Sequence, residues 1–215
     1  MASTEHRRSP LHHLASRLAA ASGPAERIRL TEVPFLTQLT LRLAPGTPAA
    51  EGAAQVLGVS LPTVPNTTSA SNDVHVLWMG PDEWLLLAPD GAAERLCEEL
   101  EGALGAHHAS VVDVSAHRTV IELAGADARE LLLKGCSLDL HPRAFTAGQC
   151  AQSTLARAQV TLLARSDEPA YCVFVRASFA EYLAEWLLDA AAEYRGAPPL
   201  DLSLADETPL VGAPA

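Results

Sequence analysis

The feature that most restricts the fold is an internal repetition, in which strand, helix, loop, hairpin and helix occur twice in the same order. Leu39, Leu41 and Leu43 alternate with polar residues, which is typical of a half-buried strand. The first copy continues with a helix at 49–57 that Gly58 ends, a polar loop at 62–73, a hairpin at 74–88 and a helix at 91–104. The second copy has a strand at 118–123, a turn at Ala124-Gly125, a helix at 126–134 ended by Gly135, a long loop, a hairpin at 155–176 and a final helix from Ser178. The predicted fold class is therefore α+β, with two pseudo-repeated β-α-β-β-α units.

Two short echoes support the repetition. Gly58-Val59-Ser60-Leu61 is echoed by Gly135-Cys136-Ser137-Leu138 at an offset of 77 (135 minus 58), and Asp82-Glu83 by Asp167-Glu168 at an offset of 85 (167 minus 82). Neither copy is expected to bury its helix faces alone, so we expect the two sheets or the two helix layers to pack as one pseudo-symmetric body. Ser178, with Glu181 three residues later, predicts a capping box at the start of the last helix.

Both ends of the chain differ from this body. Residues 1–36 form a predicted N-terminal arm with apolar residues but no core of its own: Leu11, Leu14, Leu18, Val33 and Phe35. Such an arm is either disordered or laid on another surface. Residues 196–215 hold four prolines and form a predicted acidic tail, mobile or wrapped around a partner. The predicted division is an arm at 1–36, a first repeat at 37–105, a second at 106–195 and a tail at 196–215.

The charge balance narrows the function classes. A net charge of −11 argues against nucleic-acid binding, which needs a clustered basic face. Charged residues make up 19% of the chain, below the usual quarter, which favours burial against partners. His12, His13 and Arg17 interrupt the apolar run at 11–21, which does not fit a secretory signal, and no run approaches the roughly 20 apolar residues of a membrane helix. We therefore expect a cytoplasmic protein without nucleic-acid or membrane partners.

Asp113, Ser115 and His117 contain the residue types of a hydrolase triad. In an extended segment, side chains two residues apart lie roughly 6.5–7 Å from each other, too far for a nucleophile and its base. No Gly-x-Ser-x-Gly motif surrounds Ser115. We expect Asp113 and Ser115 to make turn or cap hydrogen bonds, and we predict no catalytic residue here.

Other candidates for chemistry are equally weak. The histidine pairs His12-His13 and His107-His108 are adjacent in sequence, where two residues rarely ligate one metal, and His141 is expected in a surface loop. The cysteines are scattered, without a Cys-x-x-Cys pair, and are predicted to be buried thiols: Cys97, Cys136, Cys150 and Cys172. No metal site is therefore predicted.

Nucleotide-binding motifs are absent, since the chain has neither Gly-x-Gly-x-x-Gly nor Gly-x-x-x-x-Gly-Lys-Ser/Thr. No cofactor-binding residue is predicted. Core packing is the expected role of the three tryptophans: Trp78, Trp84 and Trp186. Four arginines of the second half are expected in solvated or ion-paired positions, with contact to an anionic ligand or acidic partner as the alternative: Arg118, Arg143, Arg157 and Arg176.

Several segments taken together resemble the gamma subunit of heterotetrameric sarcosine oxidase. These are Arg8-Ser9-Pro10-Leu11, Trp78-Met79-Gly80-Pro81-Asp82-Glu83-Trp84-Leu85-Leu86-Leu87, the stretch 113–145, and Val175-Arg176-Ala177-Ser178-Phe179-Ala180. The resemblance covers most of residues 8–195 in order, and the combination is more specific than any single piece.

The resemblance implies a fold similar to the folate-binding domains of the glycine-cleavage aminomethyltransferase. It implies alpha, beta and delta subunits as partners in an enzyme that oxidises sarcosine to glycine, with hydrogen peroxide and formaldehyde or 5,10-methylenetetrahydrofolate as further products. FAD, FMN, NAD, zinc and tetrahydrofolate are then expected on the partner subunits. No cofactor or catalytic residue is carried over to this chain.

Three functions remain as hypotheses. The first is a non-catalytic subunit that supports the assembly and stability of a flavin-dependent sarcosine oxidase. The second is a free-standing folate-binding protein of the aminomethyltransferase type, although such proteins are longer and carry a further C-terminal domain. The third is a small hydrolase using Ser115 and His117, which predicts labelling of Ser115 by a serine reagent.

Overall fold

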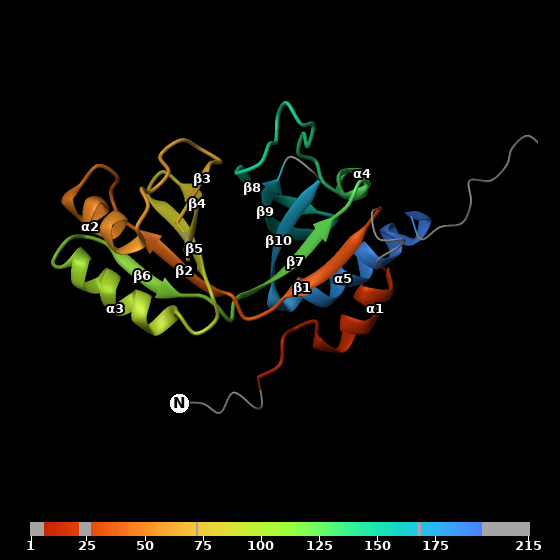
Figure 1. Ribbon diagram of the computed structural model, residues 1–215, viewed down its shortest axis with the longest axis horizontal. Coiled ribbons are helices and arrows are strands. Elements are labelled where there is room, and N and C mark those ends of the chain that lie inside the picture. The colour runs from red at the N-terminus through yellow and green to blue at the C-terminus, as the bar shows by residue number, and fades with distance from the viewer. Residues whose placement is uncertain (1–6, 22–26, 72, 167–168, 195–215) are drawn as a thin grey trace, which may run out of the picture.

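The computed structural model of the protein describes residues 7–21, 27–71, 73–166 and 169–194, and it confirms the α+β class with two repeated units in one body (Figure 1). Each unit is built on an antiparallel five-stranded sheet. The first sheet consists, in spatial order, of β3 (Thr68–Ala70), β4 (His75–Gly80), β5 (Glu83–Ala88), β2 (Thr37–Arg42) and β6 (Ser110–Asp113). The second consists of β1 (Arg29–Val33), β7 (Arg118–Ala124), β10 (Ala170–Arg176), β9 (Ala158–Ser166) and β8 (Cys150–Leu155). The order of elements predicted for each half is confirmed, with β1, β3, β6 and β8 as additional strands.

Helices cover one face of each sheet. The first sheet carries α2 (Pro48–Leu57) and α3 (Ala93–Leu104). The second carries the short 3-10 helix η2 (His12–Leu14), α1 (Ala15–Ala21), α4 (Ala128–Leu133), α5 (Ala177–Ala190) and the 3-10 helix η3 (Ala192–Tyr194). None of the helices within the described ranges combines the length and apolarity that crossing a bilayer requires.

The two units exchange edge strands. β1 precedes β2 in the chain but pairs with β7 of the second sheet, with Val33 opposite Val120. β6 precedes β7 but pairs with β2 of the first sheet, with Leu41 opposite Val111. The connections at 34–36 and 114–117 therefore cross between the sheets, which Figure 1 shows at the centre of the molecule. The exchange interlocks the two halves.

The described part of the predicted arm at 1–36 packs mainly on the second half of the same chain. Leu11, Leu18 and Leu30 are almost fully buried in the core beneath the second sheet. His13 faces Glu181 and Arg17 faces Glu185, so α1 runs alongside α5 in the same direction. The sequence left two alternatives for this segment, disorder or packing on another surface. Its described part packs on a surface, and that surface belongs to the same chain.

Three apolar clusters hold the molecule together. One lies between the first sheet and its helices, where Trp84 and Leu100 are fully buried. The second lies between the second sheet and its helices. The third joins the two sheets face to face and contains Leu77, Leu85, Leu87, Val120, Cys150, Leu163, Cys172 and Phe174. Contrary to expectation, each half buries its helices on its own sheet. The halves are joined through the opposite faces of their sheets, which confirms one of the two expected arrangements.

Some of the helix ends agree with the signals predicted from the sequence, and one does not. Thr47 caps α2 by accepting a hydrogen bond from Ala50 N, and Gly58 ends the helix with a φ of +66°, as predicted. The prediction of a capping box at Ser178 is wrong, because α5 begins at Ala177 and no side chain caps it. β10 passes directly into α5 at Arg176, which places Ser178 inside the first turn.

Gly135 follows α4 as predicted, but for a different reason from Gly58. Its φ is not in the left-handed region. A Cβ atom at this position would lie 2.6 Å from Cζ2 of Trp186, so glycine is required because the indole ring of α5 packs directly on the backbone. The echo between the two glycines therefore joins two residues with different structural roles.

Candidate functional site

The turn at Asp113–His117 was the strongest catalytic candidate in the sequence. β6 ends at Asp113 and the chain turns, so Ser115 Oγ lies 2.5 Å from Asp113 Oδ1, and Ser115 N donates to the same oxygen at 2.9 Å. The separation expected for an extended segment is therefore wrong for this pair. Ser115 Oγ also accepts a hydrogen bond from Gln38 N at 2.9 Å, which ties the crossover to β2. The predicted turn hydrogen bonds of Asp113 and Ser115 are confirmed.

His117 does not complete a triad with these residues. Among the hydrogen bonds of the described part of the chain, none joins the His117 side chain to Ser115. Burial lowers the pKa of His117, and the neighbouring cations Arg118 and Arg176 lower it further. A cationic environment opposes the imidazolium that a general base must form, so the arrangement does not support nucleophilic catalysis by Ser115.

A cavity of about 420 Å³ opens between the two sheets. Its walls are mainly apolar and include Leu87, Val120 and Phe174. The Cys172 thiol also lines the cavity, and burial raises its pKa from 9.0 to about 11. The thiol is therefore protonated at neutral pH and does not serve as a nucleophile. The size and apolar lining are within the range of small-molecule pockets.

An ion-pair network closes one side of this cavity. Arg165 Nη1 lies 2.8 Å from a Glu122 carboxylate oxygen, and Arg29 Nη2 lies 3.3 Å from the other. Arg165 and Glu122 both line the cavity and neutralise each other, and Asp73 is a further charged residue of the wall. The cavity fits an apolar group better than a strong anion or cation.

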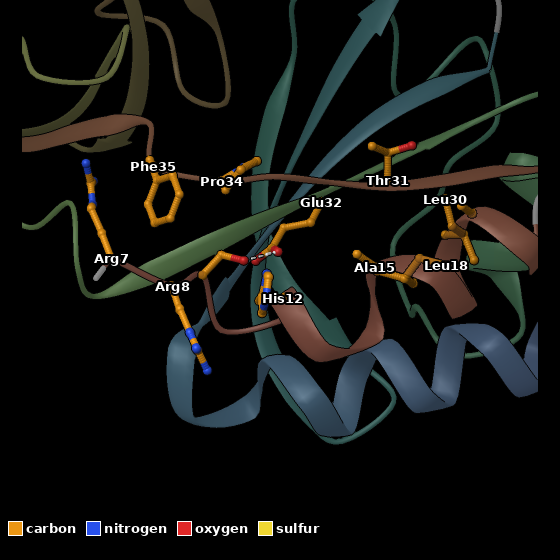
Figure 2. Close-up of a pocket in the computed structure, with 12 residues that line it drawn as sticks. Arg7, Arg8, His12, Ala15, Leu18, Leu30, Thr31, Glu32, Pro34 and Phe35 are labelled. Carbon is orange, nitrogen blue, oxygen red and sulfur yellow. Dashed lines mark hydrogen bonds between the residues drawn. The ribbon is translucent and has the colours of Figure 1, made fainter. Parts of the chain in front are cut away.

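A second cavity, of about 320 Å³, lies between the N-terminal segment and β1 (Figure 2). Glu32 is its structural centre, because its carboxylate accepts hydrogen bonds from Ser9 Oγ at 2.6 Å, Leu11 N at 3.3 Å and Thr119 Oγ1 at 2.6 Å. These contacts fasten the N-terminal segment to β7. Glu32 is thus an anchor for the segment.

Basic side chains surround the mouth of this second cavity. Arg7 stacks on Phe35 and also pairs with Asp90 at 2.7 Å, whereas Arg8 points away from the ring of Phe35 in Figure 2. His12 lines the same cavity and is exposed. Sequence reasoning missed the roles of Arg7 and Glu32. The only signal for them was a carboxylate inside the mostly apolar stretch 28–36.

The remaining sequence candidates are dispersed. Within the described ranges, no three His, Cys, Asp or Glu side chains come close enough to hold a metal ion. His141 is exposed in a loop, as predicted, and its Nδ1 accepts a hydrogen bond from Arg143 N. Cys136, Cys150 and Cys172 are buried thiols, as predicted, while Cys97 is half-buried.

The tryptophans differ in burial, and the arginines differ in whether they are exposed separately or brought together. Trp84 is fully buried, and its Nε1 donates to Pro62 O, whereas Trp78 and Trp186 are only half-buried. Arg143 and Arg157 are exposed at separate places. Arg118 and Arg176 are brought together as direct partners in the second sheet.

Comparison with known proteins decides the family. The model of the sarcosine oxidase, gamma subunit family matches residues 44–193. The chain belongs to this family. The sarcosine oxidase subunit gamma of Corynebacterium sp. (strain P-1) is 42% identical over 197 residues, which cover 91% of this gamma-family chain and 95% of that protein. The resemblance predicted from the sequence is confirmed.

Solved structures agree with this assignment. A chain of the heterotetrameric sarcosine oxidase from Corynebacterium sp. U-96, determined in complex with pyrrole 2-carboxylate, is 39% identical with a TM-score of 0.83, covering 89% of the gamma-family chain and 98% of that chain. The glycine cleavage system aminomethyltransferase T from Bartonella henselae is 16% identical with a TM-score of 0.64, covering 86% and 57% of the two chains. The second similarity shows a shared fold, as the sequence predicted.

Proposed function

We propose that this chain is a non-catalytic subunit that assembles into a heterotetrameric, flavin-dependent sarcosine oxidase and stabilises it. The observation that carries the proposal is the similarity to a sarcosine oxidase gamma subunit across 95% of that protein's length. The similarity spans both halves of the chain, so it includes the exchanged edge strands and the packing between the sheets. The role proposed here is assembly of the enzyme that oxidises sarcosine to glycine.

The partners that we propose are the alpha, beta and delta subunits, and we propose that FAD, FMN, NAD, zinc and tetrahydrofolate bind to those partners. Two features of this chain support that placement. Two of the charged groups that line the cavity between the sheets, Arg165 and Glu122, already pair with each other. The side chains of Asp113 and Ser115 are engaged with the backbone of the crossover. We therefore assign no step of the reaction to a residue of this chain, and we propose that the complex is cytoplasmic.

Co-expression tests the proposal. The three partner subunits are produced with and without this chain, which carries an affinity tag. We expect all three partners to co-purify with the tagged chain, and we expect the enzyme made without it to lose assembly or thermal stability. If the partners assemble and turn over sarcosine at full rate without this chain, and it does not bind them, the proposal is wrong.

A free-standing folate-binding protein of the aminomethyltransferase type is the alternative. The chain covers only 57% of the aminomethyltransferase that shares its fold, so a large part of that protein has no counterpart here. Calorimetric titration of the isolated chain with tetrahydrofolate separates the two functions. Tight, stoichiometric binding without a partner would favour the alternative, and we expect none.

A further inference from the structure

Two arginines face each other at one end of the second sheet. The register between β10 and β7 places Arg176 directly opposite Arg118. Directly opposite residues in an antiparallel pair have Cβ atoms about 4.5–5.5 Å apart, and like charges in these positions repel. The alternation of side chains turns both arginines to the face that carries Val120 and Phe174, toward the first sheet. The two guanidinium groups therefore share one location.

His117 adjoins this pair, and burial together with both arginines lowers the pKa of its imidazole. His117 precedes Arg118, and its backbone carbonyl accepts a hydrogen bond from Ala177 N at 2.9 Å, which holds the crossover against the start of α5. Burial lowers the pKa of Arg118, and repulsion from Arg176 lowers it further. Arg118 and Arg176 are referred to below as the cation cluster.

The cation cluster is poorly neutralised within the described part of the chain. Glu83 is the carboxylate that acts on Arg118, and it also lies 3.7 Å from Arg42. Nη1 of Arg118 is buried and has no hydrogen-bond partner among the described residues. A buried N–H of a charged group without an acceptor is unfavourable. The chain alone thus leaves a positive site with an unused donor.

Exposed aromatic side chains continue from the cluster along α5. Phe179 is 45% exposed and Tyr182 is 40% exposed. They follow Arg176 at intervals of three residues, so they lie on the same side of the helix as its first turn. Arginine together with aromatic residues is typical of protein–protein interfaces.

We propose that the cation cluster receives a carboxylate from an acidic segment of a partner subunit, with Phe179 and Tyr182 packing against the same segment. The inference rests on the proposed function and names the chemistry of one of its interfaces. Charge complementarity identifies the occupant, because two guanidinium groups converge on a site where Glu83, the carboxylate that acts on Arg118, also lies near Arg42. The two exposed aromatic side chains, Phe179 and Tyr182, favour a protein surface over a small free anion. The contact would fix the orientation of the partner.

The test compares Arg118→Gln and Arg176→Gln with Arg157→Gln, a control that removes an exposed arginine between β8 and β9. Binding of each tagged chain to the co-expressed partner subunits is measured at several salt concentrations. We expect both cluster variants to weaken binding at least about tenfold and to reduce its salt dependence. The control variant should bind within about twofold of the wild type, as expected for a surface charge outside an interface.

Thermal unfolding of the isolated chain provides the second measurement. Removal of one cation relieves repulsion, so we expect the isolated variants to unfold at the same or a higher temperature than the wild type. This result distinguishes an interface from an internal structural contact, whose loss would lower the temperature. Arg176 is exposed, so its variant remains informative if Arg118→Gln does not fold.

Three results would overturn the inference. The first is unchanged partner binding by both variants, which leaves the proposed function intact. The second is a marked loss of thermal stability in the isolated Arg176→Gln chain. The third is saturable stabilisation of the wild-type chain by inorganic phosphate, lost in Arg176→Gln while assembly is unaffected, which would assign the cluster to a small anion. Failure of the wild-type chain to bind any partner would instead contradict the proposed function.

Discussion

Arg7 lies over the face of Phe35, with 4.2 Å between its guanidinium carbon and the ring centre, and Phe35 holds a φ of +61°. The aromatic residue stands in the connection from β1 to β2, where the chain crosses between the sheets. Its left-handed backbone is unfavourable for a residue with a side chain, by about 1–2 kcal/mol. The stacked arginine, which also pairs with Asp90, holds the ring in place.

The backbone of Phe35 predicts an unusual order of stability between two substitutions. Phe35→Ala and Phe35→Gly both remove the ring, but only glycine accepts the left-handed conformation without strain. We expect the free energy of unfolding of the glycine variant to exceed that of the alanine variant by about 1 kcal/mol in urea denaturation. At Thr31 in β1, which has no positive φ, the same two substitutions should fall in the opposite order. Equal or greater stability of Phe35→Ala would contradict the prediction.

Gly135 predicts a steric conflict that a second substitution relieves. Gly135→Ala places a Cβ atom 2.6 Å from Trp186 Cζ2, and we expect it to lower the free energy of unfolding by about 1–3 kcal/mol. In a Trp186→Leu background the same change should have a smaller effect. Gly102→Ala in α3 is the matched control, because a Cβ atom added there would meet nothing within 4 Å, and it should stabilise the chain by about 0.5–1 kcal/mol. Additive effects of Gly135→Ala and Trp186→Leu would show that the indole is not the cause.

Ser115 is predicted to matter for stability and not for catalysis. Ser115→Ala removes the acceptor of the buried Gln38 N–H group, so the free energy of unfolding should fall by about 1–3 kcal/mol. Ser137→Ala, at an exposed position, should have little effect. Denaturation curves measure both. An active-site serine reagent should leave Ser115 unlabelled, and its rapid modification would revive the hydrolase hypothesis.

Cys172 predicts a loss of stability at alkaline pH. Its pKa rises from 9.0 to about 11 on folding because the thiolate would lose its hydration. Below pH 9 the thiol is protonated in both states. Between pH 9 and about 11 the unfolded chain loses the proton first, so this group lowers the free energy of unfolding as the pH rises. Urea denaturation at intervals across this range should show a shallower decline for Cys172→Ala, and parallel profiles would count against the assignment.

Local patterns were sufficient to predict the first strand, the two helices and the hairpin of each half. The alternation of Leu39, Leu41 and Leu43 and the stop at Gly58 reflect side-chain burial and backbone conformation within a few residues. The exchange of β1 and β6 left no such pattern, since pairing of Val33 with Val120 depends on residues far apart in the chain. A period-two pattern indicates that a strand has a buried face but not which sheet receives it.

The candidate site could likewise not be predicted from local sequence patterns. Sequence spacing placed Asp113 and Ser115 apart because it assumed an extended chain, whereas the strand ends and turns between them. The pairing of Arg118 with Arg176 required the register of two strands that are separated by the whole of α4, β8 and β9. Glu32 could be recognised as an anchor only when Ser9 and Thr119 were seen to converge on it.

The exchanged edge strands also govern how the chain can be made. Glu32 in β1 bonds to Thr119 in β7, 87 residues further along, so β1 waits for the whole of the first half to leave the ribosome before its partner exists. The first sheet must in turn wait for β6, which emerges just before β7. The first sheet is therefore complete once β6 has been made, whereas the second waits for β7, β8, β9 and β10. A chain truncated after the first half would leave β1 and the open edge of β2 unpaired and exposed to aggregation.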